Sequence, residues 1–223
     1  QSENGGFAAF DVDNTYSYLN EIPFADHGAL LDPPTADVSG RVVMMLGALK
    51  QKEYDFSLMS CLNYLFREQE KNGAWFGRWG TNYIYGTWSV LVGLEQTGFP
   101  ANHPAIRQAV HYLKSIQNED GGFGEDNGSY FSPPKGLRPH PSTSFQTAWA
   151  LLALMAGHEY ESEAVQKGIQ YLLKTQQADG LWREPYFTSP GFPRVFYLKY
   201  HGYSKYFPLW ALSKYYHHKE ERL

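Results

Sequence analysis

A short motif that recurs four times constrains the fold of this chain more than any other feature of its sequence. Each copy has a glutamine, a glycine four residues later and an aromatic residue two positions beyond, and the copies begin at Gln1, Gln69, Gln117 and Gln176. An apolar run with helical spacing precedes the last three copies but not the first, so we expect the chain to begin partway through a repeat. Repeats of this length bury their apolar faces only against their neighbours, which predicts an array of stacked units.

Two helical patterns, separated by a short break, lie between successive motifs. The first pattern of each pair is apolar on more than one face and the second is amphipathic, which predicts an inner and an outer ring of helices. We therefore expect an all-α fold of the α/α-toroid type, in which repeated helical hairpins form a partial barrel. The expected helices cover residues 38–49, 56–69, 87–96, 104–117, 145–156, 162–176 and 206–222.

The composition permits one large domain or a piece of a larger protein. The 223 residues are 43% apolar, which is ample for a core, and the early first motif favours the piece. No linker divides the chain, so residues 1–223 are predicted to form a single segment. A formal charge of −4 without a basic run argues against a nucleic-acid partner. The one cysteine, Cys61, lies on an apolar helical stripe and is expected to be buried.

The motif itself is expected to stabilise the fold rather than to carry chemistry. Its glycine suits a left-handed turn after a helix, and its glutamine amide can bond backbone groups near the helix end. The aromatic ring then packs back on the hairpin. Catalytic residues should therefore be sought in the loops and inner helices between the copies.

The motif-rich chain resembles the C-terminal part of the bacterial squalene-hopene cyclases over essentially its whole length. The repeats alone would fit other α/α barrels, including plant terpene cyclases and prenyltransferase β subunits. More specific are the segments NGGFAAFDVDN, DPP, WFGRWG and GFPRVFYLKYHGY, at residues 4–14, 32–34, 75–80 and 191–203. The resemblance implies a class II cyclase, in which an acid protonates a terminal double bond and the polyene closes its rings through carbocations.

The proton donor of that family, an Asp-X-Asp-Asp motif, is expected upstream of Gln1, so this chain alone should be inactive. The tetrapeptide at residues 11–14, Asp-Val-Asp-Asn, is not that donor because it lacks the third carboxylate and follows directly on the first motif. Asp and Asn readily bond nearby backbone amides, which predicts a turn at this place. A metal loop would need further acidic ligands, and we expect no metal site and no cofactor.

Aromatic rings should form the cavity wall, because a buried ring face can stabilise a cation by about 2 kcal/mol or more. Phe196, Tyr200 and Tyr203 follow Pro193 at helical spacing, which predicts a helix with all three on one face. Periodicity alone would favour an ordinary core stripe. The resemblance implies instead that Phe192 and Phe196 face the later carbocations and that Tyr200 and Tyr203 extend the wall and its polar contacts beside the acid.

The resemblance assigns five further residues to the substrate cavity or its entrance. Trp79 would shape the cavity, and Tyr85 would join the hydrogen bonds that help to reprotonate the acid. Phe10 matches a cavity position that is Tyr in some relatives. Phe24 and Ala25 resemble the constriction between the entry channel and the cavity, where Ala25 would leave an open passage. Both Trp79 and Tyr85 could also simply cap the barrel as loop aromatics.

Asp37 and Arg41 stand one helical turn apart at the start of the first inner helix. Their spacing fits a helix cap with an ion pair, worth about 0.3 to 0.5 kcal/mol if exposed. The resemblance implies instead that this turn faces the acid, where a cation keeps one carboxylate ionised and orients the proton of another. We assign Arg41 electrostatic support, because a guanidinium does not shuttle protons as an imidazole does.

The expected substrate is squalene, which implies contact with a membrane surface. By resemblance the protein should be monotopic on the cytoplasmic face of the cell membrane. An incomplete toroid exposes hairpin faces, which predicts a homodimer or a swapped assembly. The alternative function is a non-catalytic toroid module that binds an apolar ligand. A prenyltransferase would need a zinc site, and Cys61 has no partner pattern of Asp and His.

Overall fold

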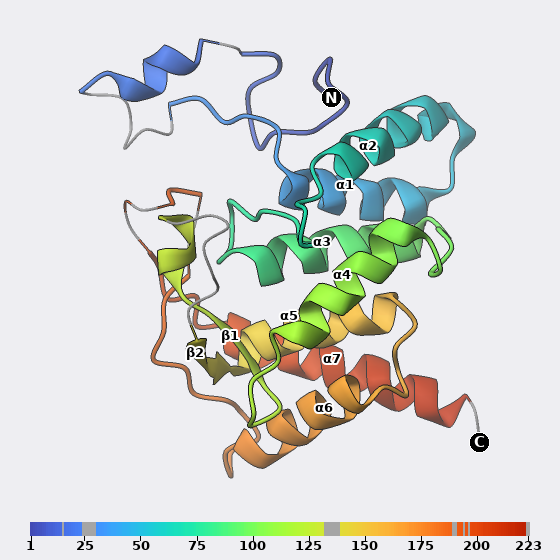
Figure 1. Ribbon diagram of the computed structural model, residues 1–223, viewed down its shortest axis with the longest axis vertical. Helices are drawn as coiled ribbons and strands as arrows, with labels where there is room; N and C mark the ends of the chain where they lie inside the picture. Colours follow the sequence, from blue (N-terminus) through green and yellow to red (C-terminus); the bar gives the residue numbers. More distant parts are fainter. Residues whose placement is uncertain are drawn as a thin grey trace.

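The structure is a computed structural model that describes residues 1–14, 16–23, 30–131, 139–188, 191–193, 195 and 197–221, without the side chains of Ser17 and Pro139. Seven α-helices lie in these ranges (Figure 1): α1 (Ala36–Leu49), α2 (Asp55–Arg67), α3 (Tyr83–Gln96), α4 (Pro104–Ser115), α5 (Ser144–Ala156), α6 (Glu163–Thr175) and α7 (Tyr203–Glu220). Short 3-10 helices cover Ser17–Glu21, Lys52–Tyr54 and Asn127–Tyr130. Two short strands, β1 (Phe123–Glu125) and β2 (Pro139–Thr143), pair antiparallel.

The odd-numbered helices form an inner row, and the even-numbered helices lie outside it (Figure 1). In the inner row, α1 packs on α3, α3 on α5 and α5 on α7, while α2 packs on α1 and α6 on α5. Every residue of α5 is buried, as its continuous apolar sequence predicts, whereas α4 and α6 bury one face. The expected inner and outer rings are thus confirmed.

Small residues let α1 and α3 approach each other closely. A Cβ added at Gly93 would lie 2.5 Å from the carbonyl oxygen of Gly40, and one added at Gly40 would lie 2.8 Å from the backbone of Ser89. Both distances are shorter than van der Waals contact. The two backbones can therefore pack together only because these positions lack a side chain.

The repeated motif clamps each hairpin to the next outer helix. In the first three copies the glutamine Nε2 donates both to the carbonyl of the motif glycine and to a carbonyl in the first turn of the following outer helix. The acceptor pairs are Gly5 (2.7 Å) and Ser57 (2.8 Å), Gly73 (2.9 Å) and Ala105 (2.8 Å), and Gly121 (2.8 Å) and Ala164 (2.8 Å). The motif glycines have positive φ, as expected. The scaffold role is confirmed, and it extends to joining neighbouring repeats.

A second repeated bond aligns the inner helices with the motifs. In the first three copies the backbone N–H of the motif aromatic residue donates to a hydroxyl on the next inner helix at 2.9 to 3.0 Å: Phe7 to Ser39, Trp75 to Thr87 and Phe123 to Thr147. These bonds set a common register for α1, α3 and α5. Asp37, Tyr85 and Phe145 each lie two residues before the hydroxyl, so they occupy the same position in three successive repeats.

Two expectations about local structure were wrong. Residues 191–202 form no helix in the described part of the chain, and α7 begins only at Tyr203. Thr188 and Leu198 instead exchange two backbone hydrogen bonds of 2.9 Å and form an isolated antiparallel bridge. The loop between the third motif and α5 contains the paired strands β1 and β2, which the sequence analysis did not predict. In the described ranges, no helix has the length and apolarity needed to cross a bilayer.

Candidate functional site

Asp37 lies in the first turn of α1 and is completely buried. Its Oδ2 accepts a hydrogen bond from the backbone N–H of Trp79 at 2.7 Å, and Oδ1 has no hydrogen-bond partner among the described residues. Burial raises the pKa of Asp37, and its polar neighbours oppose this shift only in part. The side chain is therefore a buried acid, which is unlike the exposed helix cap that simple spacing suggests.

Arg41 does not form the ion pair that its spacing from Asp37 allows. Both residues are described, and the guanidinium lies instead over the ring of Trp88, with Cζ 4.7 Å from the ring centroid. Its charge nevertheless acts on the phenol groups of Tyr85 and Tyr203, whose pKa values it lowers against the larger effect of burial. Arg41 is thus the cation beside a group of buried hydroxyls and aromatic faces.

Tyr85 lies on the first turn of α3, in the register position that Asp37 holds on α1. Burial raises the pKa of Tyr85 far above its usual range, and the charge of Asp37 raises it further. The Tyr85 ring packs edge-on against Trp149 at 4.9 Å between centroids. Its phenol therefore stays protonated near the charge of Asp37 and can donate a hydrogen bond.

Tyr200 and Tyr203 stack on each other although no helix joins them. Their ring centroids are 4.7 Å apart with an interplanar angle of 22°. Tyr203 is half-buried, and burial raises its pKa to about 12. It contacts Trp149 at 5.6 Å, which connects the pair to the ring cluster on the inner helices. The expected shared face is present, but it comes from a turn followed by the start of α7.

Trp79 and Phe192 come from two segments that meet beside Asp37. A Cβ added at Gly191 would lie 2.6 Å from the ring of Trp79, so the indole fits closely only against a glycine. Gly191 also has φ of +96°, a backbone conformation that glycine adopts without strain. Phe192, next to it, is half-buried. Trp79 therefore connects Asp37 with the segment that carries Phe192.

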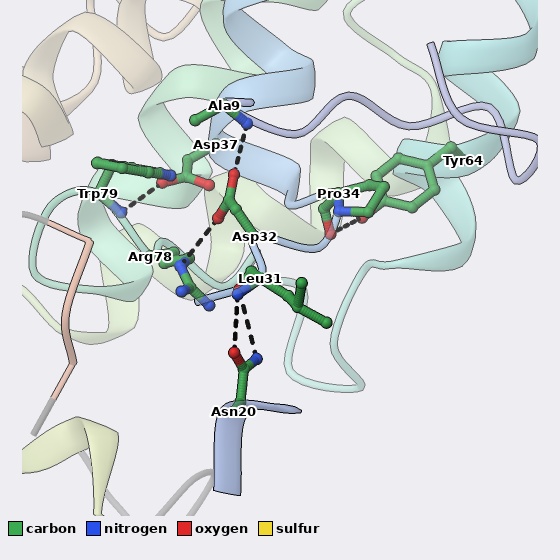
Figure 2. Close-up of polar contacts among 9 residues, drawn as sticks. All are labelled: Ala9, Asn20, Leu31, Asp32, Pro34, Asp37, Tyr64, Arg78 and Trp79. Atoms are coloured by element: carbon green, nitrogen blue, oxygen red, sulfur yellow. Dashed lines mark hydrogen bonds and ion pairs between the residues drawn. The ribbon is translucent and has the colours of Figure 1, made fainter. Parts of the chain in front are cut away.

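The N-terminal loop reaches this region through Asp32, as Figure 2 shows. Asp32 Oδ1 pairs with Nε of Arg78 at 3.1 Å, and Oδ2 accepts from the N–H of Ala9 at 2.5 Å. Burial raises the pKa of Asp32. Phe10, which follows Ala9, is 54% exposed. The structure brings Phe10 into the neighbourhood of the site but not into contact with its buried rings.

The turn predicted at residues 11–14 is confirmed. Asp13 has a φ of +53° and its Oδ1 accepts from the N–H of Glu3 at 2.8 Å. Three other predicted residues, Phe24, Ala25 and Phe196, lie outside the described residues.

The sequence analysis assigned no role to the rings that form the centre of the site. Trp88 on α3 and Trp149 on α5 stack with centroids 5.8 Å apart and an interplanar angle of 15°. Phe207 on α7 packs edge-on against both, at 5.2 Å and 5.4 Å. Aligning the three inner helices on their shared hydroxyl would have placed Trp88 and Trp149 on adjacent faces, close to Arg41. This alignment could therefore have predicted the two central rings from the sequence.

Two glutamates, the buried Glu125 and the half-buried Glu184, bind the N-termini of inner helices. Each stands two residues after a motif aromatic residue. The Glu125 carboxylate accepts from the N–H groups of Asn82, Tyr83 and Ile84 at 3.0 to 3.1 Å, and Glu184 accepts from the N–H of Ser144. The first contact holds the N-terminus of α3 and the second that of α5. These carboxylates therefore set the start of the two helices that carry Tyr85 and Trp149.

A cavity of about 420 Å³ opens next to the ring cluster. Its lining includes Tyr200, Tyr203, Phe145, Glu184 and Thr188. The described part of the chain thus offers a buried acid, a cation, protonated phenols and stacked ring faces in one region. Such a set can support a proton-donating carboxyl group and stabilise positive charge on an apolar substrate.

Comparison with known proteins identifies relatives over nearly the whole chain. Residues 1–217 match the family model described as squalene-hopene cyclase C-terminal domain. The squalene–hopene cyclase of Zymomonas mobilis is 59% identical over 215 residues, which are 96% of this chain and 33% of that protein. The squalene–hopene cyclase of Bradyrhizobium diazoefficiens is 56% identical over 216 residues, again 96% and 33%. This chain therefore spans about one third of the length of these relatives.

A solved structure agrees on the fold. The type II terpene cyclase MstE from Scytonema, solved as a variant with its substrate geranylgeranyl dihydroxybenzoate, superposes with a TM-score of 0.63 at 20% identity. The match covers 96% of this chain and 63% of that one. It confirms the α/α toroid, and the named relatives favour a cyclase fragment over a non-catalytic module. The chain belongs to the squalene-hopene cyclase C-terminal domain family.

Proposed function

We propose that the longer protein containing this chain cyclises squalene to hopene and hopanol. An acid upstream of Gln1 protonates a terminal double bond, ring closures carry the cation along the polyene, and the final cation loses a proton or takes up water. The 223 residues supply part of the cavity wall and the residues that support the acid. The relatives' names and the polyprenyl substrate of the Scytonema enzyme support this choice of substrate.

One observation carries the proposal: the buried carboxyl group of Asp37 lies in the same site as the Arg41 guanidinium and the phenols of Tyr85 and Tyr203. In this site Asp37 can accept a hydrogen bond from the acid and Tyr85 can donate one to it, while Arg41 supplies positive charge that favours the ionised form of the acid after proton transfer. The adjacent rings of Trp88 and Trp149 present faces that stabilise cations, as the position of Arg41 over Trp88 illustrates.

Product analysis of the full-length protein tests the function. Squalene in detergent is incubated with the purified protein, and the extract is separated by gas chromatography with mass detection. Pentacyclic hydrocarbon and alcohol are expected. Recovery of squalene alone from folded full-length protein would overturn the proposal.

We also propose that the protein acts on a membrane surface, at the cytoplasmic face of the cell membrane, because squalene resides in the bilayer. The test is flotation of the full-length protein with phospholipid vesicles, with and without squalene. Protein that stays at the bottom of the gradient in both cases would contradict this placement.

A further inference from the structure

Phe145 lies in the first turn of α5, in the register position that Asp37 holds on α1 and Tyr85 holds on α3. Each of the three residues stands two positions before the hydroxyl that accepts from a motif N–H group. Two of these positions carry polar groups of the candidate site, whereas the third carries an apolar ring. The fold therefore places the three side chains in the same way, and only their chemistry differs.

The ring of Phe145 packs against the aromatic rings at the centre of the site. Its centroid lies 5.1 Å from the ring of Trp149 at an interplanar angle of 73°, and 6.2 Å from the ring of Tyr203. Both of these rings also contact Phe207, at 5.4 Å and 5.2 Å. Phe145 therefore extends the ring cluster to the start of α5.

The same ring also lines two cavities. One is the cavity of about 420 Å³ next to the ring cluster, and the other is a neighbouring cavity of about 480 Å³. Their linings have Phe145, Pro185 and Tyr186 in common, so the two cavities adjoin at these residues. Phe145 is 5% exposed, which shows that only a small part of its ring reaches them.

Charged side chains make both cavities accessible to water. The exposed Lys199 and Lys205 and the half-buried Glu184 line the first cavity. The half-buried Asp126 and His140 line the second. Ionised groups of this kind are stable only where they are hydrated or paired, so water reaches the cavity side of Phe145.

The ring cluster does not by itself repel water. The Nε1 atom of Trp149 is buried and has no hydrogen-bond partner among the described residues, so it would bind a water molecule that reached it. A carbocation reacts with water on contact, and a site that carries one must keep water out until the rings have closed. Phe145 contacts both Trp149 and the two cavities, so its ring separates them.

We propose that Phe145 keeps the water of the two cavities away from the carbocations and thereby lets cyclisation run to completion. The proposal rests on the proposed function, since it assumes that cations form beside the ring cluster. Without the ring, a water oxygen would give an electron pair to the cationic carbon and form a C–O bond. The oxonium proton would pass to cavity water, and the product would be an alcohol with fewer than five rings. A polar side chain at this register position would bind water, which explains why the third repeat carries an apolar ring there.

Product analysis of Phe145→Ala in the full-length protein tests this role. Squalene is incubated with the protein in water enriched in oxygen-18, and the products are separated by gas chromatography with mass detection. The share of alcohols with fewer than five rings should rise at least about tenfold over the wild type, and their oxygen should carry the label. Phe145→Leu, which keeps a large apolar side chain at the barrier, should restore most of the wild-type product pattern. Phe145→Val removes less of the side chain than Phe145→Ala and should give the same alcohols in smaller excess, so the test does not depend on one variant folding.

The matched control is Phe66→Ala. Phe66 is half-buried on outer helix α2, packs against Phe99 at 5.3 Å and belongs to the lining of neither cavity. The control should lower the Tm, because it also loses a packed ring, but it should keep the wild-type product pattern. An equal rise of alcohols in the control, or unchanged products in the folded Phe145 variants beside a wild type that forms pentacyclic products, would overturn the role of Phe145. A folded wild type that leaves squalene unchanged would overturn the proposed function, and this role with it.

Discussion

The backbone N–H of Trp79 donates to the carboxylate of Asp37 at 2.7 Å, which joins a loop and an inner helix that lie 42 residues apart. The bond fixes the loop that leads into α3 against the first turn of α1. Asp37 is therefore oriented by the scaffold, as a residue that supports a neighbouring acid must be.

Replacing Asp37 with Asn should stabilise the full-length protein at neutral pH while it slows cyclisation. Burial raises the pKa of Asp37 above 3.8, so the folded state disfavours the ionised form. The wild type has its full stability below pH 3.8, where the Asp37 carboxyl group is protonated in the folded and the unfolded state. Part of this stability is lost as the pH rises through the pKa that Asp37 has in the folded state. The Tm advantage of Asp37→Asn should therefore grow with pH over that window, whereas an advantage that grows as the pH falls would contradict the buried-acid assignment.

Replacing Arg41 with Gln should reduce squalene turnover with little change in stability. The guanidinium is exposed and lies over Trp88, so its loss removes positive charge from the site without opening the core. A matched control is Arg107→Gln, which removes an equally exposed arginine from outer helix α4, where it pairs with Glu159 at 2.7 Å. The control should keep wild-type turnover, and equal losses in both variants would show that Arg41 acts only on stability.

Replacing Glu125 with Ala should strongly destabilise the fold. Three buried N–H groups at the start of α3 would lose their acceptor, and each unsatisfied group lowers the free energy of unfolding by about 1 to 3 kcal/mol. Urea unfolding of the full-length protein should therefore show a loss of at least about 3 kcal/mol. The control, Glu163→Ala, alters an exposed glutamate on α6 and should leave the unfolding midpoint almost unchanged.

Cys61 should resist alkylation in the folded protein. It is completely buried, and burial raises the pKa of its thiol to about 12. At pH 8 the thiolate fraction is therefore far below that of an ordinary cysteine. Mass spectrometry after iodoacetamide treatment should find this site unmodified until urea is added. Rapid labelling without urea would contradict the packing of α2 on α1.

The sequence was sufficient for the repeating part of the fold because the information there is local. Each repeat contains its own signals: a glycine at a left-handed turn, apolar residues at helical spacing and the recurring glutamine. The inner and outer rings of helices and the burial of Cys61 could therefore be predicted. The second partner of the glutamine in the first three copies lies 36 to 56 residues away and could not be predicted from the motif alone.

The candidate site was harder to predict because it depends on contacts between repeats. The resemblance led to Asp37, Arg41, Tyr85 and Tyr203, which do lie together, but spacing misled at Pro193, where pairing of Thr188 with Leu198 replaces the expected helix. Trp88 and Trp149 were missed because each looks like ordinary core in its own helix. The contact between the two indole rings becomes visible only when the inner helices are aligned on the hydroxyl residues that bind the motif N–H groups.

The most direct test of the central claim compares two tyrosine variants of the full-length protein. Tyr85 is half-buried and Tyr112 is buried, and both phenols have strongly raised pKa values. Tyr85 lies close to the charge of Asp37, whereas Tyr112 lies on outer helix α4, away from the site. With squalene as substrate, Tyr85→Phe should lower kcat at least about tenfold, the size expected for a group that assists proton transfer, at an unchanged Tm. Tyr112→Phe should keep the wild-type kcat. Wild-type turnover by Tyr85→Phe would contradict the account.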